Sequence, residues 1–151
     1  MLLMRSRTKI LLLALGALLL VQAVPAGRNH QNPPVVQEPP WSSPQVRALA
    51  VRACFDCHSN QTRWPWYSNV APISWLVSRD VSEGRRHLNF SQWNTPQRHA
   101  KDAANEVKHG DMPMWIYLPL HADARLSDTE HAQLIDGLTA TFGTKGGTDQ
   151  N

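Results

Sequence analysis

The chain has 151 residues, which is enough for about one domain of ordinary size. With 42% hydrophobic and 18% charged residues, it resembles neither a disordered chain nor a protein with many membrane spans. The formal charge of +3 comes from Arg5, Arg7 and Lys9, because the 12 basic residues that follow balance the 12 acidic ones. Since the body of the chain has no basic surplus, we expect no nucleic-acid partner.

The first 26 residues have the order of a targeting segment. Three basic residues precede the apolar run of residues 10–21, and small residues follow through Ala26. This order is typical of a secretory signal, and the apolar stretch, counted on to Val24, is long enough for an uncleaved anchor. We therefore expect residues 1–26 to be a signal peptide or an N-terminal membrane anchor. The rest of the chain is then periplasmic or otherwise exported, as a soluble protein or on a membrane tether.

A proline-rich stretch follows the leader. Four prolines lie within residues 33–40, where they remove backbone donors and favour extended geometry. We predict a stiff linker over residues 27–41, a folded domain over 42–144 and a flexible tail over 145–151.

Both cysteines of the chain lie in one motif, Cys54-Phe55-Asp56-Cys57-His58. This C-x-x-C-H pattern is the attachment signature of c-type haem. The two thiols add to the vinyl groups of the porphyrin, and the adjacent histidine becomes an axial ligand of the iron. We predict one covalent haem c per chain, attached through Cys54 and Cys57 and ligated by His58. A redox dithiol would need a βαβ context, a zinc site would need further cysteines, and a disulfide across two residues would be strained.

Apolar residues at helical spacing predict four helices, and no run alternates long enough to predict a strand. Thr95-Pro96 opens the third predicted helix, and a capping box from Ser127 to Glu130 opens the fourth. The predicted class is all-α, a small helical domain wrapped around the haem. The predicted helices cover residues 43–54, 72–88, 95–110 and 127–143.

The second iron ligand is sought among the methionines. After the leader only Met112 and Met114 remain, both on the loop between the third and fourth helices. Met112 is favoured because Pro113 fixes the following backbone and Gly110 ends the preceding helix. Met114 and a histidine, with His121 first among the histidines, stay as alternatives.

Aromatic residues gather shortly after the motif, at Trp64, Trp66 and Tyr67. Their indole N–H and phenol groups are suited to line a haem pocket and to donate hydrogen bonds to a propionate. The same residues could equally pack a small core.

The chain resembles the bacterial haem-binding domain proteins of the cytochrome c type. The resemblance implies a compact cytochrome c-like fold, with Cys54 and Cys57 as thioether attachments, His58 as proximal ligand and Met112 as distal ligand. It covers roughly residues 35–140 and rests on segments 54–60, 64–72, 88–93, 110–113 and 120–127.

The function expected from these observations is one-electron transfer by a haem with His and Met ligands. Redox proteins and the haem maturation machinery would be its partners. We expect no enzyme, because the sequence has no Ser-His-Asp grouping and no phosphate-binding glycine loop. Two alternatives remain: a haem-based sensor or ligand-binding module with a displaceable distal ligand, and an exported thiol-disulfide oxidoreductase.

Overall fold

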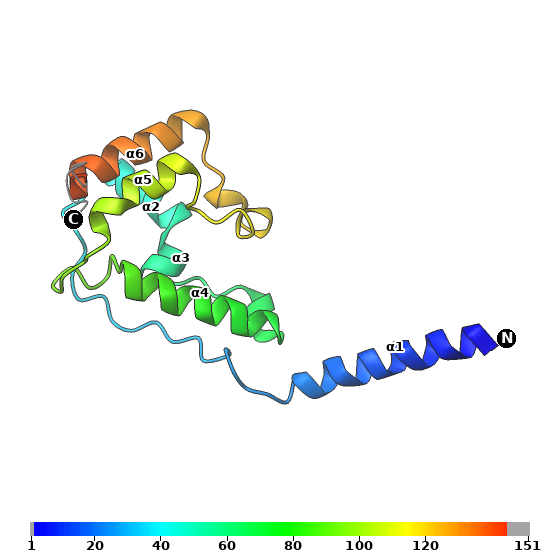
Figure 1. The fold of residues 1–151 in the computed structure, drawn as a ribbon. Coiled ribbons are helices and arrows are strands. Elements are labelled where there is room, and N and C mark those ends of the chain that lie inside the picture. The colour runs from blue at the N-terminus through cyan, green and yellow to red at the C-terminus, as the bar shows by residue number, and fades with distance from the viewer. Residues whose placement is uncertain (1, 145–151) are drawn as a thin grey trace, which may run out of the picture. The chain divides into compact units, whose positions relative to one another are not determined.

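A computed structural model describes residues 2–144, with side chains from Ser6 onward (Figure 1). Within this part of the chain the fold is all-α, as predicted, and the one β pairing is an isolated parallel bridge between Gln37 and Gln92. The predicted tail, residues 145–151, lies outside the described residues. The α-helices are α1 (Leu2–Val21), α2 (Pro44–Ala53), α3 (Phe55–His58), α4 (Ile73–His87), α5 (Ala103–His109) and α6 (Asp128–Phe142). The 3-10 helices are η1 (Trp66–Asn69), η2 (Ala100–Asp102), η3 (Leu118–Leu120) and η4 (Ala122–Ala124).

The starts of α2 and α6 are fixed by capping residues. At the start of α2, the hydroxyl of Ser43 accepts the N–H of Val46 at 3.2 Å, next to a proline at the first helical position. At the start of α6, Ser127 and Glu130 form the predicted capping box. Gly143, with φ of 74°, ends that helix. The predicted second helix is α4.

The third predicted helix begins later than the sequence indicated. Thr95-Pro96 lies in a loop, and helical structure starts only at η2, which leads into α5. The side chain of Gln97 stabilises the non-helical conformation of this loop. It accepts the N–H of Asn89 at 2.9 Å and donates to the carbonyl of Gln92 at 3.0 Å. Such local side-chain bonds to the backbone compete with helix formation, and here they override the Thr-Pro start signal.

The proline-rich stretch predicted as a linker is hydrogen-bonded to the folded domain. The N–H of Gln37 donates to the carbonyl of Ser91 at 3.2 Å, and the carbonyl of Gln37 accepts the N–H of Trp93 at 2.9 Å. The carbonyl of Pro34 accepts the Nδ2–H of Asn60 at 2.9 Å. Proline lacks a donor but keeps its acceptor, so ordered contacts begin before the predicted domain boundary at residue 42.

The chain forms two compact units. Unit 1 consists of Met1–Gln31 and Trp64–Asp80, and unit 2 consists of Asn32–Arg63 and Val81–Asn151. The leader predicted over residues 1–26 therefore shares unit 1 with part of the segment that was predicted as a separate domain.

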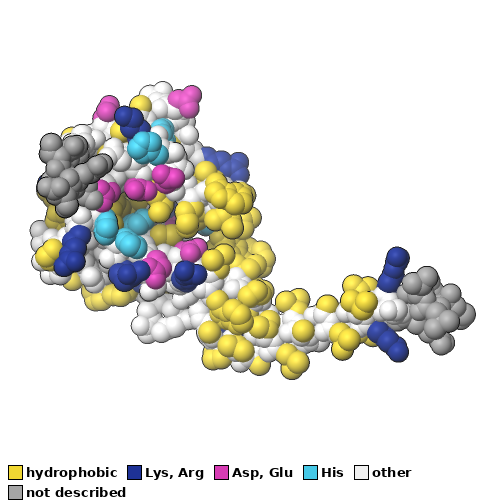
Figure 2. All heavy atoms as spheres, viewed as in Figure 1, with side chains coloured by type: hydrophobic (Ala, Val, Ile, Leu, Met, Phe, Trp, Pro, Cys, Tyr) yellow, Lys and Arg dark blue, Asp and Glu magenta, His cyan; other side chains and the backbone are white. Residues whose placement is uncertain are grey.

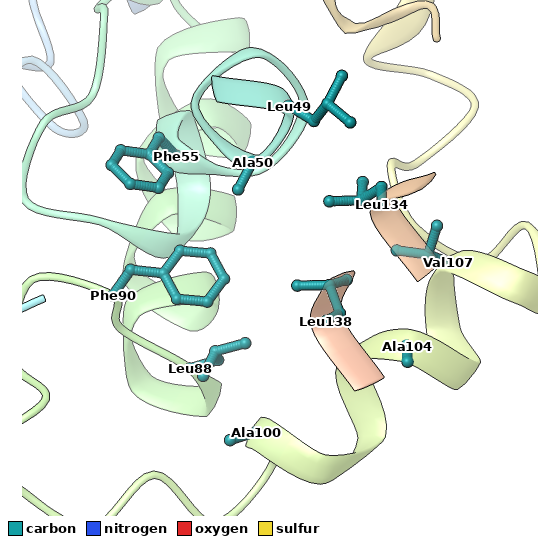
Figure 3. Close-up of a cluster of buried hydrophobic side chains, with 10 residues drawn as sticks. All are labelled: Leu49, Ala50, Phe55, Leu88, Phe90, Ala100, Ala104, Val107, Leu134 and Leu138. Atoms are coloured by element: carbon teal, nitrogen blue, oxygen red, sulfur yellow. The ribbon is translucent and has the colours of Figure 1, made fainter. Parts of the chain in front are cut away.

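Unit 2 contains the hydrophobic core, in which α2, α5 and α6 pack together (Figures 1 and 3). Leu134 and Leu138, four residues apart on α6, are fully buried. Gly137 lies against Val46 of α2, and a Cβ at this glycine would come within 2.2 Å of a valine methyl. The close contact of α2 and α6 therefore depends on a missing side chain. The core cluster consists of Leu49, Ala50, Phe55, Leu88, Phe90, Ala100, Ala104, Val107, Leu134 and Leu138.

Unit 1 contains α1, whose apolar side chains lie largely in solvent (Figure 2). Within residues 2–144, no helix combines the length and the apolar character needed to cross a membrane.

Candidate functional site

The C-x-x-C-H motif forms a single helical turn in unit 2. The N–H of Cys54 still bonds to the carbonyl of Ala50 at the end of α2, at 2.8 Å. The carbonyl of Cys54 then accepts the N–H groups of Cys57 and His58, at 3.2 and 2.9 Å. These bonds close α3, so both thiols and the imidazole project from one compact turn. No disulfide joins the two cysteines.

The thiol of Cys54 is held in its protonated form. Burial, with a smaller contribution from Cys57, raises the pKa of Cys54 to about 12. Redox-active cysteines need a lowered pKa, because the thiolate is the nucleophile. The environment of Cys54 is the opposite of that of a catalytic dithiol.

The imidazole of His58 is oriented by a backbone carbonyl. Its Nδ1 lies 3.1 Å from the carbonyl oxygen of Leu88, the residue after α4. A carbonyl can only accept, so Nδ1 carries the hydrogen and Nε2 keeps its lone pair. Burial lowers the pKa of His58, against smaller opposing contributions from backbone carbonyls, which favours the neutral imidazole that binds metals. The carbonyl of His58 also accepts the N–H of Phe90 at 2.8 Å.

A glycine of α4 allows the helix to lie against the motif. A Cβ added at Gly84 would come within 2.5 Å of the carbonyl oxygen of Cys57 and 2.9 Å of its Cβ. The same glycine accepts, through its carbonyl, the N–H of Leu88 at 2.9 Å. Sequence reasoning missed this residue. A glycine in the interior of a helix destabilises the helix by about 1 kcal/mol relative to alanine, so its presence can indicate a close contact.

A buried carboxylate inside the motif is the second feature that sequence reasoning missed. Asp56 accepts the backbone N–H of Arg63 at 2.9 Å and two of its guanidinium N–H groups at 3.2 Å. It also accepts the hydroxyl of Tyr117 at 2.6 Å. Burial, followed by the hydrogen bond to Asp56, raises the pKa of Tyr117, so the phenol keeps its proton and remains a donor. Asp56 thus links the C-x-x-C-H motif to the segment that follows both methionines.

Met112 lies on a loop whose backbone is held at its start. Gly110, with φ of 78°, ends α5, and the carbonyl of Glu106 accepts the N–H groups of Asp111 and Met112 at 3.0 and 3.2 Å. The half-buried side chain of Met112 packs against the core cluster, as does that of Cys54. Met112, which the sequence favours as sulfur ligand, and Cys54 of the motif therefore pack against the same core.

Met114 and His121, the alternative ligands, each have contacts with Tyr117. Met114 is half-buried, and its carbonyl accepts the N–H of Tyr117 at 2.9 Å. The ring of His121 stacks on that of Tyr117 with centroids 3.6 Å apart, and its Nδ1 lies 2.8 Å from the carbonyl of Tyr117. His121 is thus engaged with the residue that also bonds to Asp56.

The three predicted aromatic site residues lie in unit 1, whereas Cys54, Cys57, His58 and Met112 lie in unit 2. Trp64 is half-buried and stacks on His30 with ring centroids 4.5 Å apart. Its buried indole N–H has no hydrogen-bond partner among the described residues. Trp66 is 79% exposed, and its ring makes a T-shaped contact with the ring of Tyr67, with centroids 5.8 Å apart.

The structure and the comparisons together define a class of protein. An all-α domain presents two thiols and an oriented imidazole from one turn, and within residues 2–144 no cluster of three or more His, Cys, Asp or Glu side chains could hold a metal ion by itself. The chain matches the model of the haem-binding domain family over residues 16–140, and it belongs to that family. No curated protein and no solved structure matches it.

The residues of unit 2 fit a haem. The neutral imidazole of His58 has Nε2 available for iron, and Leu88 supplies the hydrogen-bond acceptor that metal-bound histidines ordinarily have on their other nitrogen. Two thiols that share no disulfide lie on the same turn. Apolar residues of the core cluster pack beside Cys54.

Proposed function

We propose that this protein is a c-type cytochrome, a one-electron carrier with one haem attached to Cys54 and Cys57. The observation that carries the proposal is the oriented imidazole: the C-x-x-C-H turn presents His58 with Nδ1 bonded to the Leu88 carbonyl and Nε2 left to ligate. A bare redox dithiol has no need of this arrangement. The raised pKa of Cys54 also argues against the alternative of a thiol-disulfide oxidoreductase.

The residues of the chain have distinct tasks in this proposal. His58 would ligate the iron, and its hydrogen bond to Leu88 would fix the direction of the ring and raise its basicity. Met112 would supply the second ligand to the iron, on a loop held by the backbone bonds of Asp111 and Met112 to Glu106, with Met114 and His121 as alternatives. When bound, the haem supplies reversible one-electron chemistry at its iron. Trp64, Trp66 and Tyr67, which the sequence predicts as haem contacts, lie in unit 1 and are not part of this proposal.

We further propose that the carrier works in the periplasm or an equivalent exported location, where haem maturation machinery attaches the cofactor and redox proteins exchange electrons with it. Such partner contacts are expected to be small and brief. No turnover of a substrate is proposed.

The ligand set is tested by visible spectra of the matured protein, oxidised and reduced, for the wild type, Met112→Ala and Met114→Ala. The proposal predicts a low-spin wild type, a shift toward high spin in Met112→Ala, and a wild-type spectrum in Met114→Ala, which is the matched control. A high-spin wild type that Met112→Ala leaves unchanged would favour the sensor or ligand-binding alternative. A protein without Soret absorbance would contradict the proposal altogether.

A further inference from the structure

Unit 1 exposes a set of large apolar side chains in and before the first turns of α4. Within the first turns of α4, Ser74 is buried whereas Ile73, Trp75 and Leu76 are exposed, so one side of the helix faces inward and the other is apolar and solvated. We call the exposed set the apolar face of unit 1. It consists of Trp66, Val70, Ile73, Trp75 and Leu76.

The end of the leader is bonded into the same unit. The side-chain amide of Gln22 donates to the carbonyl of Ala71 at 2.8 Å and accepts the N–H of Ala71 at 3.0 Å. Ala71 is fully buried, so these two bonds satisfy polar backbone groups that are out of reach of water. A third bond nearby runs from the hydroxyl of Ser74 to the carbonyl of Ala26, at 3.3 Å.

A glycine at the end of the predicted leader brings the backbone still closer. Gly27 has φ of 74°, and a Cβ there would come within 2.3 Å of the carbonyl oxygen of Ser74. Only glycine suits both the left-handed backbone and the close approach. The contacts from Gln22 to Gly27 thus run across the point where a signal peptidase would cut.

Cleavage after Ala26 would remove partners that unit 1 uses. The backbone N–H and carbonyl of Ala71 would both lose their bonds to the side chain of Gln22. The match to the haem-binding domain family begins at residue 16, inside α1, so the end of this helix is part of the matched domain. Both observations favour a leader that stays on the mature chain.

The charges of the two units differ in a way that points to the occupant of the apolar face. Unit 1 has five basic residues and one acidic residue, Asp80, whereas unit 2 has ten basic and eleven acidic residues. The positive charge of the whole chain therefore lies in the unit that exposes apolar surface. Arg79 is exposed on α4, three and four residues after Leu76 and Trp75. Tryptophan, aliphatic and cationic side chains together are the composition of surfaces that bind anionic bilayers.

We infer that unit 1 is a membrane-binding unit: α1 is retained in the mature protein and buried in a bilayer, and the apolar face rests in the interfacial region beside it. Tryptophan rings of the face lie at the level of the headgroups, and Arg79 meets lipid phosphates. Basic side chains near the N-terminal end of α1 (Figure 2) are available to other phosphates. Binding does not require α1 to cross the bilayer, because an apolar helix can be buried at the interface. The inference does not rest on the proposed electron-carrier function.

Retention of the leader is tested on the full chain, expressed with export and haem maturation machinery and isolated from the membrane fraction. Peptide mapping of the mature protein is expected to recover peptides from residues 10–26. Peptides that begin at or near Gly27, with none from the preceding segment, would overturn the inference. This readout is independent of whether haem is attached.

The apolar face is tested by hydroxyl-radical footprinting of the same full chain in vesicles of phosphatidylethanolamine and phosphatidylglycerol. Trp66 and Trp115 are both 79% exposed, in unit 1 and unit 2 respectively, so Trp115 is a matched internal control. We expect Trp66 to be oxidised severalfold more slowly than Trp115, with Trp75 protected as well. Equal oxidation of Trp66 and Trp115 would show that the face is in water and would refute the docking surface.

Discussion

Unit 2 buries Leu134 and Leu138 completely, whereas unit 1 leaves Leu20 76% exposed and Trp66 79% exposed. Their charges differ too, because unit 2 pairs acidic and basic side chains internally while unit 1 has a basic excess. In a soluble domain, large apolar side chains are removed from water and single exposed ones need no explanation, but a group of them next to an apolar helix does. Unit 2 therefore has a buried core of its own, whereas unit 1 leaves large apolar side chains exposed, which is the difference that the inferred membrane binding would explain.

The largest effect that separates the units is expected from truncating a leucine in each. Leu134→Ala removes a fully buried side chain of unit 2 and should lower the free energy of unfolding by about 2–5 kcal/mol. Leu20→Ala, at an exposed position of α1, should change it by less than about 0.5 kcal/mol in the absence of membranes. Urea unfolding of the two matured variants measures both changes. Equal losses of unfolding free energy would show that the two units do not differ in this way.

The next effect concerns the buried carboxylate of unit 2. Tyr117→Phe removes a hydrogen bond to Asp56 without changing the volume of the ring, and should cost about 1.5–3 kcal/mol, the range for bonds to charged groups. The loss is measured by urea unfolding. A cost indistinguishable from zero would mean that Arg63 alone satisfies Asp56.

Two glycine substitutions, one in each unit, are expected to differ in their effect on stability. In Gly84→Ala the added methyl group clashes with the carbonyl oxygen of Cys57, and the substitution should destabilise the matured protein by about 1–3 kcal/mol. Gly16→Ala in α1 is the control, because its added Cβ would meet nothing within 4 Å apart from its chain neighbours and the backbone of its own helix. Thermal unfolding followed at the Soret band measures both. Identical melting temperatures of the two variants would show that α4 does not pack closely against the C-x-x-C-H motif.

The smallest predicted effect is a pH dependence at the start of α6. Hydrogen bonds from Arg52 and Ser127 lower the pKa of Glu130 from 4.5 to about 2. A carboxylate with a lowered folded-state pKa adds stability that is complete above about pH 4.5 and is lost as the pH falls toward 2. Urea midpoints measured across this range should fall more in the wild type than in Glu130→Gln. Asp136→Asn, which removes an exposed carboxylate of the same helix, should follow the wild type.

Local signals predicted most of the fold. Ser43, Gly110 and the capping box at Ser127 act through contacts within a few residues, so the sequence alone locates those helix ends. The third helix began later than predicted, because Gln97 bonds to Asn89 and Gln92 in a way that no start signal reveals.

The candidate site was predictable only where its residues are adjacent. The motif of residues 54–58 could be found directly, since five consecutive positions carry it. The carbonyl of Leu88, the glycine at position 84 and the phenol of Tyr117 reach the motif through tertiary packing, and Tyr117 lies 61 residues from Asp56. Such partners depend on how α4 and the loop after Met112 fold back, which no local pattern encodes.

The division into units could not be predicted either. The reciprocal bonds between Gln22 and Ala71 join residues 49 positions apart, and the sequence assigned these residues to a leader and to a separate domain. A side-chain amide that pairs with a buried backbone has no sequence signature of its own.

The central claim is that a haem is covalently attached at Cys54 and Cys57, and intact-mass measurement under denaturing conditions tests it most directly. The full chain, expressed with haem maturation machinery, should have the mass of the polypeptide plus one haem, and the double variant Cys54→Ala, Cys57→Ala should have the polypeptide mass alone. A wild-type mass equal to that of the bare polypeptide, from cells that mature another c-type cytochrome normally, would contradict the account.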